Sequence, residues 1–256
     1  MFQEERRQKI IEILNRQNAV SVKELSKIFG ITDDTVRADL DSLEEQGVLK
    51  RVHGGAMPVR SVAPPVNVGN IQKAAAKRKI AQAALKLIRD GEMIFLDVSA
   101  GNLAVAELLL QSAVRYNITV ATNMIDVLAM LAKEKNMKLI FVGGALNKHR
   151  NGFCGSLTLD FIERLKPDIA FVGAVGADIN ADSVSSYDIE DGLTKAGIIR
   201  ISKKAYVLAD SDKLGGSGNY NYAKLSSLSG LITDQTPSAE FMRQAKKIPS
   251  FEVIVP

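Results

Sequence analysis

The sequence predicts an α/β protein of two domains, an N-terminal winged helix-turn-helix and a larger, doubly wound, mainly parallel α/β domain. Short helical patterns and an alternating apolar and basic segment fill residues 1–57, as in a small helical domain that ends in a hairpin. From residue 92 on, short apolar runs alternate with helical patterns, which is typical of a parallel sheet covered by helices on both faces. With 256 residues, 46% of them hydrophobic, the chain can form two cores.

The first two helices are predicted within residues 4–30. The first has an apolar face made by Ile10, Ile13 and Leu14. Ser21 and the glutamate three residues later form a capping box, in which each side chain satisfies a free backbone N–H group. A second, short helix therefore begins after Ser21, and Gly30 ends it because glycine tolerates the left-handed turn.

A third helix and a hairpin follow. Thr32 is placed to cap the helix, and two aspartates in its first turn suit the helix dipole. Its apolar positions are Val36, Leu40 and Leu43. Gly47 ends this helix, and residues 48–55 alternate apolar and basic residues before a glycine pair. This alternation predicts a two-stranded wing.

The larger domain is predicted to span residues 71–256, after a proline-containing linker at residues 58–70. A basic helix over residues 71–88 begins it. Seven apolar runs have the length of buried strands: 93–96, 118–121, 139–142, 169–172, 205–208, 231–232 and 253–255. Helical patterns separate most of these runs, for instance at 103–110, 125–132 and 161–165.

The composition excludes several classes of protein. A single cysteine, Cys154, allows no internal disulfide and no cysteine-based zinc cluster, and two histidines make a metal site improbable. The sequence has no nucleotide-binding glycine motif, so we expect no cofactor. The charged start and the lack of a run of about 20 apolar residues predict a cytoplasmic protein without a membrane span.

The net charge of +4 does not by itself indicate nucleic acid. Residues 1–60 contain ten Lys and Arg and ten Asp and Glu, so the segment with the helix-turn-helix pattern is neutral. The basic excess lies further along, between residues 73 and 89. The prediction of DNA binding therefore depends on the motif.

In a helix-turn-helix, the polar face of the second helix enters the major groove. Arg37 is the best candidate for a guanine contact, because its planar fork matches the O6 and N7 atoms of that base. Basic residues of the wing would reach phosphates or the adjacent minor groove. The expected DNA-binding residues are Ser21, Thr32, Thr35, Arg37, Lys50, Arg51 and His53. The helical pattern alone also fits a three-helix unit that makes protein contacts.

Polar residues follow several of the predicted strands of the larger domain. They lie in residues 96–102, 121–123, 142–144 and 208–213. Ligands of open parallel sheets bind at the carboxyl ends of the strands, where helix N-termini also attract anions. Hydroxyl, amide, carboxylate and ammonium groups together suit a sugar phosphate. The alternatives are a turn at Gly144, a helix cap at Asp97 and a solvated pair of Glu190 with Lys195.

Three segments resemble the signature of the DeoR family of sugar-metabolism regulators. They are SVKELS from residue 21, TVRADLDSLE from residue 35 and KRVHGGA from residue 50. The resemblance covers nearly the whole chain. Ala38 stands where the family commonly has a second arginine. The resemblance implies a repressor of a sugar-uptake or sugar-catabolism operon that binds double-stranded operator DNA as a dimer or tetramer and responds to a phosphorylated sugar.

The effector domain of that family is similar to ribose-phosphate and glucosamine-phosphate isomerases, so the resemblance implies this fold for residues 71–256. Transferred by position, together with Asp97 on the first loop, the expected effector-binding residues are Asp97, Ser99, Gly101, Asn102, Thr122, Asn123, Gly144, Glu190, Lys195, Asp210 and Lys213. The loop at 99–102 has fewer hydroxyl groups than is usual in the family. Outside this set, we expect Cys154 to be a small buried residue. We expect His149 and Arg150, in a polar loop, to be solvated, and the alternative is that they border the pocket.

An alternative function is that of a sugar-phosphate isomerase with an accessory DNA-binding domain. Enolisation needs a carboxylate base near a cation, for which Asp97 or Glu190 with Lys213 is conceivable. We expect a regulator rather than an enzyme, because an isomerase gains nothing from a recognition helix. Isomerisation of pentose or hexose phosphates that is lost in Lys213→Ala would favour the enzyme.

Overall fold

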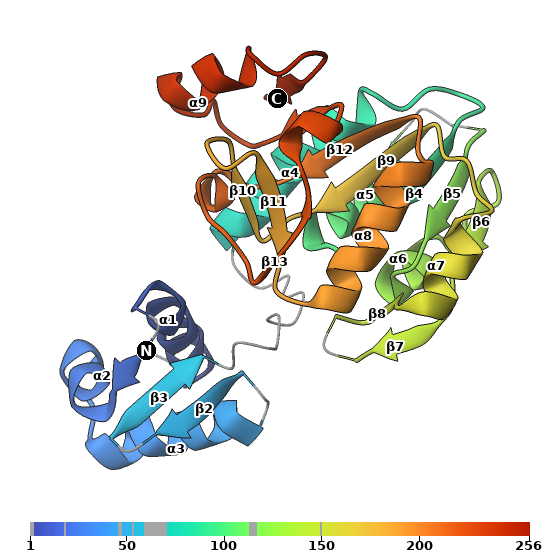
Figure 1. Cartoon of the computed structure of the whole chain (residues 1–256). Coiled ribbons are helices and arrows are strands. Elements are labelled where there is room, and N and C mark those ends of the chain that lie inside the picture. The colour runs from blue at the N-terminus through green and yellow to red at the C-terminus, as the bar shows by residue number, and fades with distance from the viewer. Residues whose placement is uncertain are drawn as a thin grey trace. The chain divides into compact units, whose positions relative to one another are not determined.

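The computed structural model describes residues 3–17, 19–45, 48–52, 54–58, 71–112, 117–148 and 150–256. They form two compact units, one within Met1–Pro64 and one within Pro65–Pro256 (Figure 1). Gly47, His53, His149 and most of the predicted linker, residues 59–70, lie outside the described residues. The domain boundaries at 57 and 71 therefore stay predictions.

The smaller unit combines helices with a small antiparallel sheet. Its elements are α1 (Gln3–Gln17), β1 (Val20–Ser21), α2 (Val22–Phe29), α3 (Asp33–Glu45), β2 (Leu49–Val52) and β3 (Gly55–Pro58). The order of the strands in the sheet is β1-β3-β2. The predicted helices and hairpin are confirmed. The sheet has one strand more than the predicted two-stranded wing, because the chain between α1 and α2 pairs with β3, Val20 opposite Ala56.

Caps set the ends of the two short helices. The Ser21 Oγ atom accepts a hydrogen bond from the Glu24 N–H group at 3.1 Å, which caps α2 as the sequence predicts. Gly30 ends α2 with φ 64°, a backbone conformation that favours glycine. At the start of α3, the Thr32 Oγ1 atom accepts from the Thr35 N–H group at 3.3 Å. The apolar faces then meet in one core, which includes Ile10, Leu14, Leu25, Val36, Leu40 and Leu43.

The larger unit contains a seven-stranded parallel sheet with the order β15-β14-β12-β9-β4-β5-β6. Its strands are β4 (Met93–Leu96), β5 (Thr119–Thr122), β6 (Lys138–Phe141), β9 (Ile169–Gly173), β12 (Lys204–Leu208), β14 (Gly230–Ile232) and β15 (Glu252–Ile254). Each of the seven predicted runs corresponds to one of these strands. The chain moves outward from β4 toward β6 and then returns to β9, so the strand order reverses beside β4. Ligands of such folds bind at this reversal.

Helices cover both faces of this sheet (Figure 1). They are α4 (Ile71–Leu85), α5 (Ala100–Gln111), α6 (Ile125–Leu131), α7 (Ser156–Ile162), α8 (Ile189–Ile201) and α9 (Ala239–Ala245). The first three contribute to one buried cluster and the last three to the other. The predicted doubly wound α/β fold is confirmed. The helix predicted at 161–165 is misplaced, because α7 ends at Ile162, where a turn leads into Pro167.

Two small antiparallel sheets extend the larger unit, and the strand pattern of the sequence did not predict them. One pairs β7 (Ala145–Asn147) with β8 (Gly152–Cys154). The other joins β10 (Gly176–Asp178), β11 (Ser183–Ser186) and β13 (Tyr220–Ala223). These strands have three or four residues each.

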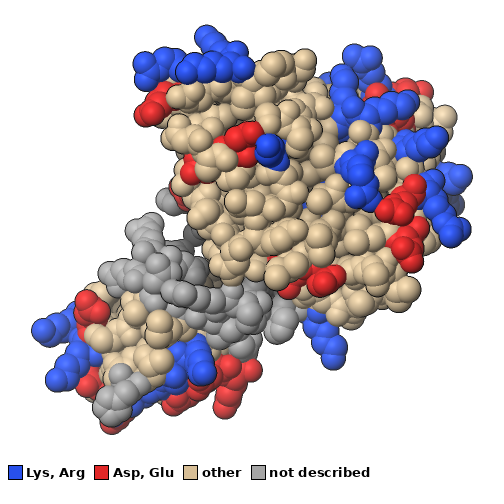
Figure 2. Space-filling model, viewed as in Figure 1, with Lys and Arg blue, Asp and Glu red and all other residues tan. Residues whose placement is uncertain are grey.

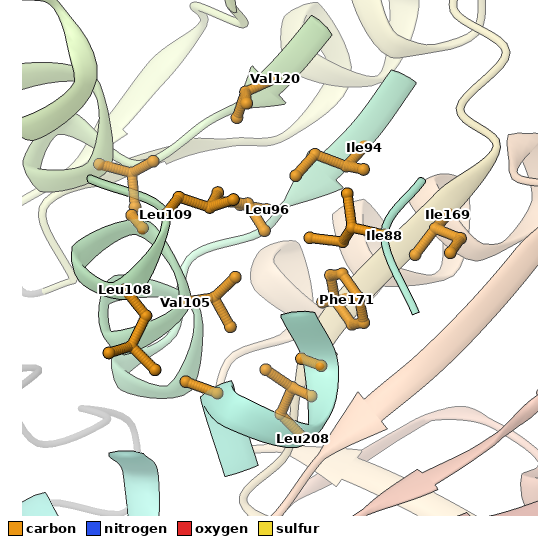
Figure 3. Packing of buried hydrophobic residues seen from close by; sticks show 14 of the residues in the cluster. Ile88, Ile94, Leu96, Val105, Leu108, Leu109, Val120, Ile169, Phe171 and Leu208 are labelled. Atoms are coloured by element: carbon orange, nitrogen blue, oxygen red, sulfur yellow. The ribbon is translucent and has the colours of Figure 1, made fainter. Parts of the chain in front are cut away.

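The strands of the large sheet direct alternate side chains to the two cores. On β4, Ile94 and Leu96 lie in the core under α4 and α5, whereas Phe95 lies in the opposite one. Figure 3 shows the first core, in which Val105 and Leu109 of α5 point toward the strand residues Leu96 and Phe171. This packing fixes the β4–α5 turn at the carboxyl edge of the sheet. Among the described residues, no helix has the length and apolar composition needed to cross a membrane.

Candidate functional site

The outer face of α3 carries exposed polar side chains, as the helical pattern predicts. Asp34, Arg37, Ala38 and Asp41 are all exposed, and Thr35 at the start of the helix is half-buried. The Arg37 Nη1 atom lies 2.9 Å from the Asp34 Oδ1 atom. The side chains of both residues are more than half exposed, so this ion pair contributes little stability and breaks at low cost. Arg37 is therefore free to exchange Asp34 for another partner.

The wing is attached to α3 through Arg51. Its Nη1 atom bonds the Asp41 carboxylate and the backbone carbonyl of Arg37, and its backbone N–H group donates to Glu44 Oε1 at 2.7 Å. These contacts hold β2 against α3, and the predicted phosphate contact of Arg51 stays a prediction. Lys50, one residue before, is exposed and keeps the predicted orientation toward solvent. The predicted His53 lies outside the described residues.

A buried ion cluster, which the sequence patterns did not predict, joins α1 to α3. The Asp39 side chain is fully buried, and its Oδ2 and Oδ1 atoms lie 2.6 Å from Arg6 Nε and 3.0 Å from Arg7 Nε. Asp39 is three residues after Val36 and one before Leu40, so it falls on the apolar stripe of α3. An acid at such a position needs a cationic partner, and this was the available signal. The cluster therefore fixes the orientation of α3 relative to α1, and with it the direction in which the polar face of α3 points.

The surface charge of the smaller unit is mixed. On the side that Figure 2 shows, Lys and Arg side chains alternate with Asp and Glu, in agreement with the equal numbers of both signs in residues 1–60. The described residues on this side of the unit therefore form no broad basic surface. This mixed charge distribution favours binding through individual side chains, and Arg37 and Lys50 are exposed and available for such contacts.

The β4–α5 turn brings together several of the predicted effector-binding residues. Asp97 is fully buried, and its carboxylate accepts hydrogen bonds from the Asn102 side chain at 2.6 Å and from the Gly173 N–H group at 3.1 Å. Ser99 caps α5, with its Oγ atom 3.2 Å from the Asn102 N–H group. Gly101 packs on β12, since a Cβ atom there would lie 3.2 Å from the Leu208 side chain. Asp97 thus orders the turn from within, rather than capping the helix.

Lys195 of α8 completes this group of buried charges. Its side chain is only 3% exposed, and its Nζ atom pairs with the Asp97 carboxylate and, at 3.0 Å, with Asp191 Oδ1. It also donates to the Val98 carbonyl at 3.3 Å. The alternative of a solvated pair with Glu190 is wrong, because Glu190 is exposed and the partners of Lys195 are two other carboxylates.

Asp191 is the second carboxylate of this cluster. Burial raises its pKa, but the nearby charges of Lys195 and Arg150 outweigh burial and hold the pKa below its ordinary value. The Ser186 hydroxyl also donates to Asp191 Oδ2 at 2.6 Å. Asp191 is therefore ionised at neutral pH.

Arg150 was expected to be solvated, and this expectation is wrong. Its side chain is 12% exposed, and its Nη2 atom donates to the Val98 carbonyl at 3.4 Å. The loop between β7 and β8 places it there, and the hairpin itself is attached to β5: Asn123 donates through Nδ2 to the Phe153 carbonyl at 2.7 Å. Thr122, also buried, accepts through Oγ1 from the Met124 N–H group at 3.1 Å.

The remaining predicted residues lie apart from this cluster. Gly144 has φ 150°, and a Cβ atom there would lie 2.0 Å from Thr158 Oγ1, so this glycine serves a tight turn. Asp210 and Lys213 follow β12 and pair with each other at 3.4 Å. They are next to a cavity of about 340 Å³ whose lining includes Ser211, Leu214 and Gln235. The predicted set therefore divides into a buried group at β4 and a partly exposed pair at β12.

Cys154 is half-buried on β8, whereas the sequence predicts a buried residue. Burial, together with Asp188, Asp191 and Glu190, raises the pKa of its thiol to about 11. Because the thiolate is the reactive species, we predict that iodoacetamide at pH 7.5 modifies Cys154 roughly 100-fold more slowly in the folded chain than in the chain unfolded by guanidinium. Equal rates in the two states, measured by mass spectrometry, would contradict this assignment.

Comparison with known families gives a match in each unit. Residues 6–62 match the DeoR-like helix-turn-helix domain. Residues 72–235 match the DeoR C terminal sensor domain. The two matches include Arg37 and Lys50 in the smaller unit, and the Asp97–Lys195 cluster in the larger one.

Individual relatives match over nearly the full length. The glycerol-3-phosphate regulon repressor of Escherichia coli (strain K12) is 31% identical over 244 residues, which are 95% of this chain and 95% of the repressor. The HTH-type transcriptional repressor GlcR of Bacillus subtilis (strain 168) is 32% identical over 243 residues, 94% of this chain and 92% of GlcR. Among solved structures, ribose 5-phosphate isomerase A from Methanocaldococcus jannaschii is 15% identical with a TM-score of 0.41, over 56% of this chain and 55% of the isomerase.

Proposed function

Since this chain belongs to the DeoR family of transcription regulators, we propose that it represses a sugar-uptake or sugar-catabolism operon, and that a phosphorylated sugar modulates its binding to operator DNA. It acts in the cytoplasm as a dimer or tetramer, because helix-turn-helix proteins pair symmetric half-sites. The names of two relatives support repression: one represses a glycerol-3-phosphate regulon and the other is a transcriptional repressor.

The DNA-binding part of the proposal depends on one observation, the exposed polar face of α3 and the fixed position of this helix within its unit. The helix has a buried apolar stripe on one side and an exposed polar face on the other, and Arg51 and Asp39 fix it against the wing and α1. Such a helix can enter the major groove without rearrangement of its own unit. Arg37 reads a base there, and Lys50 contacts phosphate. Ser21, Thr32 and Thr35, at the starts of the two helices, contact the sugar-phosphate backbone of the DNA. Arg51 and His53 are proposed to contact it as well.

The effector part of the proposal is supported by the polar groups at the carboxyl ends of the parallel strands. Buried Asp97, Asn102 and Lys195 lie there, and Ser99 caps the helix that follows. Buried charges are costly even when they are paired, and clusters of them are concentrated at binding and catalytic sites. Gly101, Thr122 and Asn123 would contribute to the same site from the neighbouring turns. Asp210 and Lys213 would contribute from the end of β12, and Gly144 and Glu190, which lie apart from the buried group, stay predicted members of the set.

The isomerase alternative has less support. The Asp97 carboxylate already accepts hydrogen bonds from Asn102, Gly173 and Lys195, so it is not poised to abstract a proton. Glu190 is exposed to solvent. We therefore propose that this protein is not an enzyme. Turnover of pentose and hexose phosphates that disappears in Lys213→Ala would show otherwise.

Two substitutions on the DNA-binding face test the docking of α3. Arg37→Ala is expected to weaken binding to the cognate duplex by about 1–3 kcal/mol, or roughly 5- to 150-fold, and to relax the preference at one base position. The cognate duplex is obtained by selection from a random library, and the affinity is measured by fluorescence anisotropy. Binding of Arg37→Ala equal to that of the wild type would mean that α3 does not read bases through this residue.

Lys50→Ala provides the matched comparison. Lys50 is exposed on the wing, where it would meet a phosphate, so its loss should weaken binding to all duplexes alike. The slope of log affinity against log salt concentration should fall by about one unit. An unchanged salt slope, in a titration from 50 to 200 mM KCl, would remove Lys50 from the interface.

A further inference from the structure

Arg150 lies mostly buried beside Lys195, with its side chain 12% exposed and most of its hydrogen-bonding capacity unused within the described residues. A guanidinium has five N–H donors. Among the described residues, the contacts of the Arg150 guanidinium are the 3.4 Å hydrogen bond to the Val98 carbonyl and a 3.9 Å approach of Nη1 to Asp191 Oδ2. The Nε atom is buried without a hydrogen-bond partner in the described part of the chain. A mostly buried cation with so few contacts is unfavourable unless another group completes its hydrogen bonds.

Two buried amide oxygens near the same turn also have no partner within the described residues. They are the Oδ1 atoms of Asn102, which is fully buried, and Asn123, which is 2% exposed. Each amide nitrogen is bound: Asn102 donates to the Phe171 carbonyl at 2.8 Å and Asn123 to the Phe153 carbonyl. These hydrogen bonds fix the orientation of both amide groups, so that both Oδ1 atoms are available to accept a hydrogen bond from a ligand. Hydroxyl groups are the natural donors to such oxygens.

The geometry points to Arg150 as the group that binds the anion of the effector, with Asp191 as an internal competitor that the ligand anion displaces. This inference rests on the proposed function and identifies the ligand class as a hydroxylated carbon skeleton with a phosphate or carboxylate. The planar fork of arginine suits either anion through two parallel hydrogen bonds. The Asn102 and Asn123 oxygens accept from the hydroxyl groups.

Competition follows from the charges of the cluster. Two cations, Lys195 and Arg150, face two carboxylates, Asp97 and Asp191, so a further anion can enter only if one carboxylate withdraws. Asp97 is held by three donors, whereas the contact of Asp191 with Arg150 is long. Asp191 lies in the first turn of α8, so its withdrawal would couple binding to the position of this helix.

Substitutions with opposite signs test the inference on the full chain. The probes are inorganic phosphate and a panel of glycerol 3-phosphate, ribose 5-phosphate and glucose 6-phosphate, ranked by thermal shift and then measured by calorimetry. Arg150→Ala should weaken binding of the tightest probe roughly 10- to 100-fold. Asp191→Asn, which removes the competing charge and keeps the shape, should strengthen it roughly 3- to 10-fold. Arg200→Ala, an exposed arginine paired with Glu163, should change nothing.

The outcomes separate this inference from the proposed function. If the wild type binds a probe and Arg150→Ala binds it equally well, Arg150 is not the anion-binding group, although the effector class stands. If Asp191→Asn weakens binding as Arg150→Ala does, the pair is only structural. If the wild type binds no probe, the proposed effector class fails, and this inference fails with it. If Arg150→Ala does not fold, Arg150→Lys is the substitute, because it keeps the positive charge. Arg150→Lys should weaken binding of the probe roughly 3- to 10-fold, because lysine lacks the planar fork of arginine.

Discussion

Asp39→Ala is expected to destabilise the smaller unit by about 3–5 kcal/mol, because it leaves the buried Arg6 and the partly buried Arg7 without their counter-ion. Arg6 is 9% exposed, and both Arg6 and Arg7 direct Nε to the Asp39 carboxylate. A unit of this size buries little apolar surface, so a loss of this magnitude takes most of its stability. Operator binding should be lost together with the fold of α3.

Hydrogen exchange in the full chain locates this effect. Amides of α1 and α3 should lose protection in Asp39→Ala, whereas those of β4, β9 and β12 should keep it. Asp34→Ala is the matched control, since Asp34 is an exposed aspartate on the same helix and its pair with Arg37 contributes little. Protection of α3 in Asp39→Ala equal to that in Asp34→Ala would mean that the ion cluster does not hold α1 against α3.

Lys195→Ala should destabilise the larger unit by a similar amount, about 3–5 kcal/mol at pH 7. The substitution leaves Asp97 and Asp191 buried with like charge, and of the cations in the cluster only Arg150 remains, within the described part of the chain. In the wild type, Lys195 and Arg150 keep the pKa of Asp191 below its ordinary value, although burial raises it. Without Lys195, burial dominates and the pKa of Asp191 should rise.

The sign of the pH dependence follows from this reversal. In the wild type, a lowered carboxyl pKa contributes stability that is present above the unfolded pKa and is lost as the pH falls through the folded pKa. In Lys195→Ala, a raised pKa allows Asp191 to take up a proton at mildly acidic pH, which relieves the repulsion. The difference in free energy of unfolding between the two proteins should therefore shrink between pH 7 and pH 5. Urea unfolding at both pH values measures it.

Lys203→Ala is the control for this experiment. Lys203 also pairs with a carboxylate, Asp168, at 2.7 Å, but its side chain is exposed. Lys203→Ala should therefore change the free energy of unfolding only slightly at either pH. If Lys195→Ala behaves like Lys203→Ala, the buried pairs do not stabilise the β4–α5 turn.

The arrangement of the large sheet could be predicted from the sequence because its strands are buried on both faces. Such strands are short, continuous apolar runs, and Ile94, Phe95 and Leu96 illustrate how successive residues enter opposite cores. The helix caps at Ser21 and Thr32 were equally predictable, because capping depends on residues only three positions apart. Local patterns therefore determine most of the fold.

The parts that could not be predicted depend on residues distant in the sequence. The ion pairs of Asp39 join positions 32 and 33 residues apart, and the pair of Lys195 with Asp97 spans 98 residues. Arg150 lies in the polar loop between β7 and β8, and such a loop is expected to be solvated. Only the contact of the β7–β8 hairpin with the residue that follows β5 shows that its side chain is mostly buried. The effector-binding residues were assigned from their positions in the sequence. Position alone cannot distinguish the buried Lys195 from the partly exposed Lys213.

The most direct test of the account measures DNA binding and effector response together. A duplex selected from a random library by the full chain is labelled, and its binding is followed by fluorescence anisotropy at fixed salt while sugar phosphates are added. The account predicts that at least one phosphorylated sugar changes the affinity by 5-fold or more, as typical coupling free energies imply, and that its unphosphorylated form does not. Failure to select any duplex, or an affinity that no sugar phosphate alters, would contradict it.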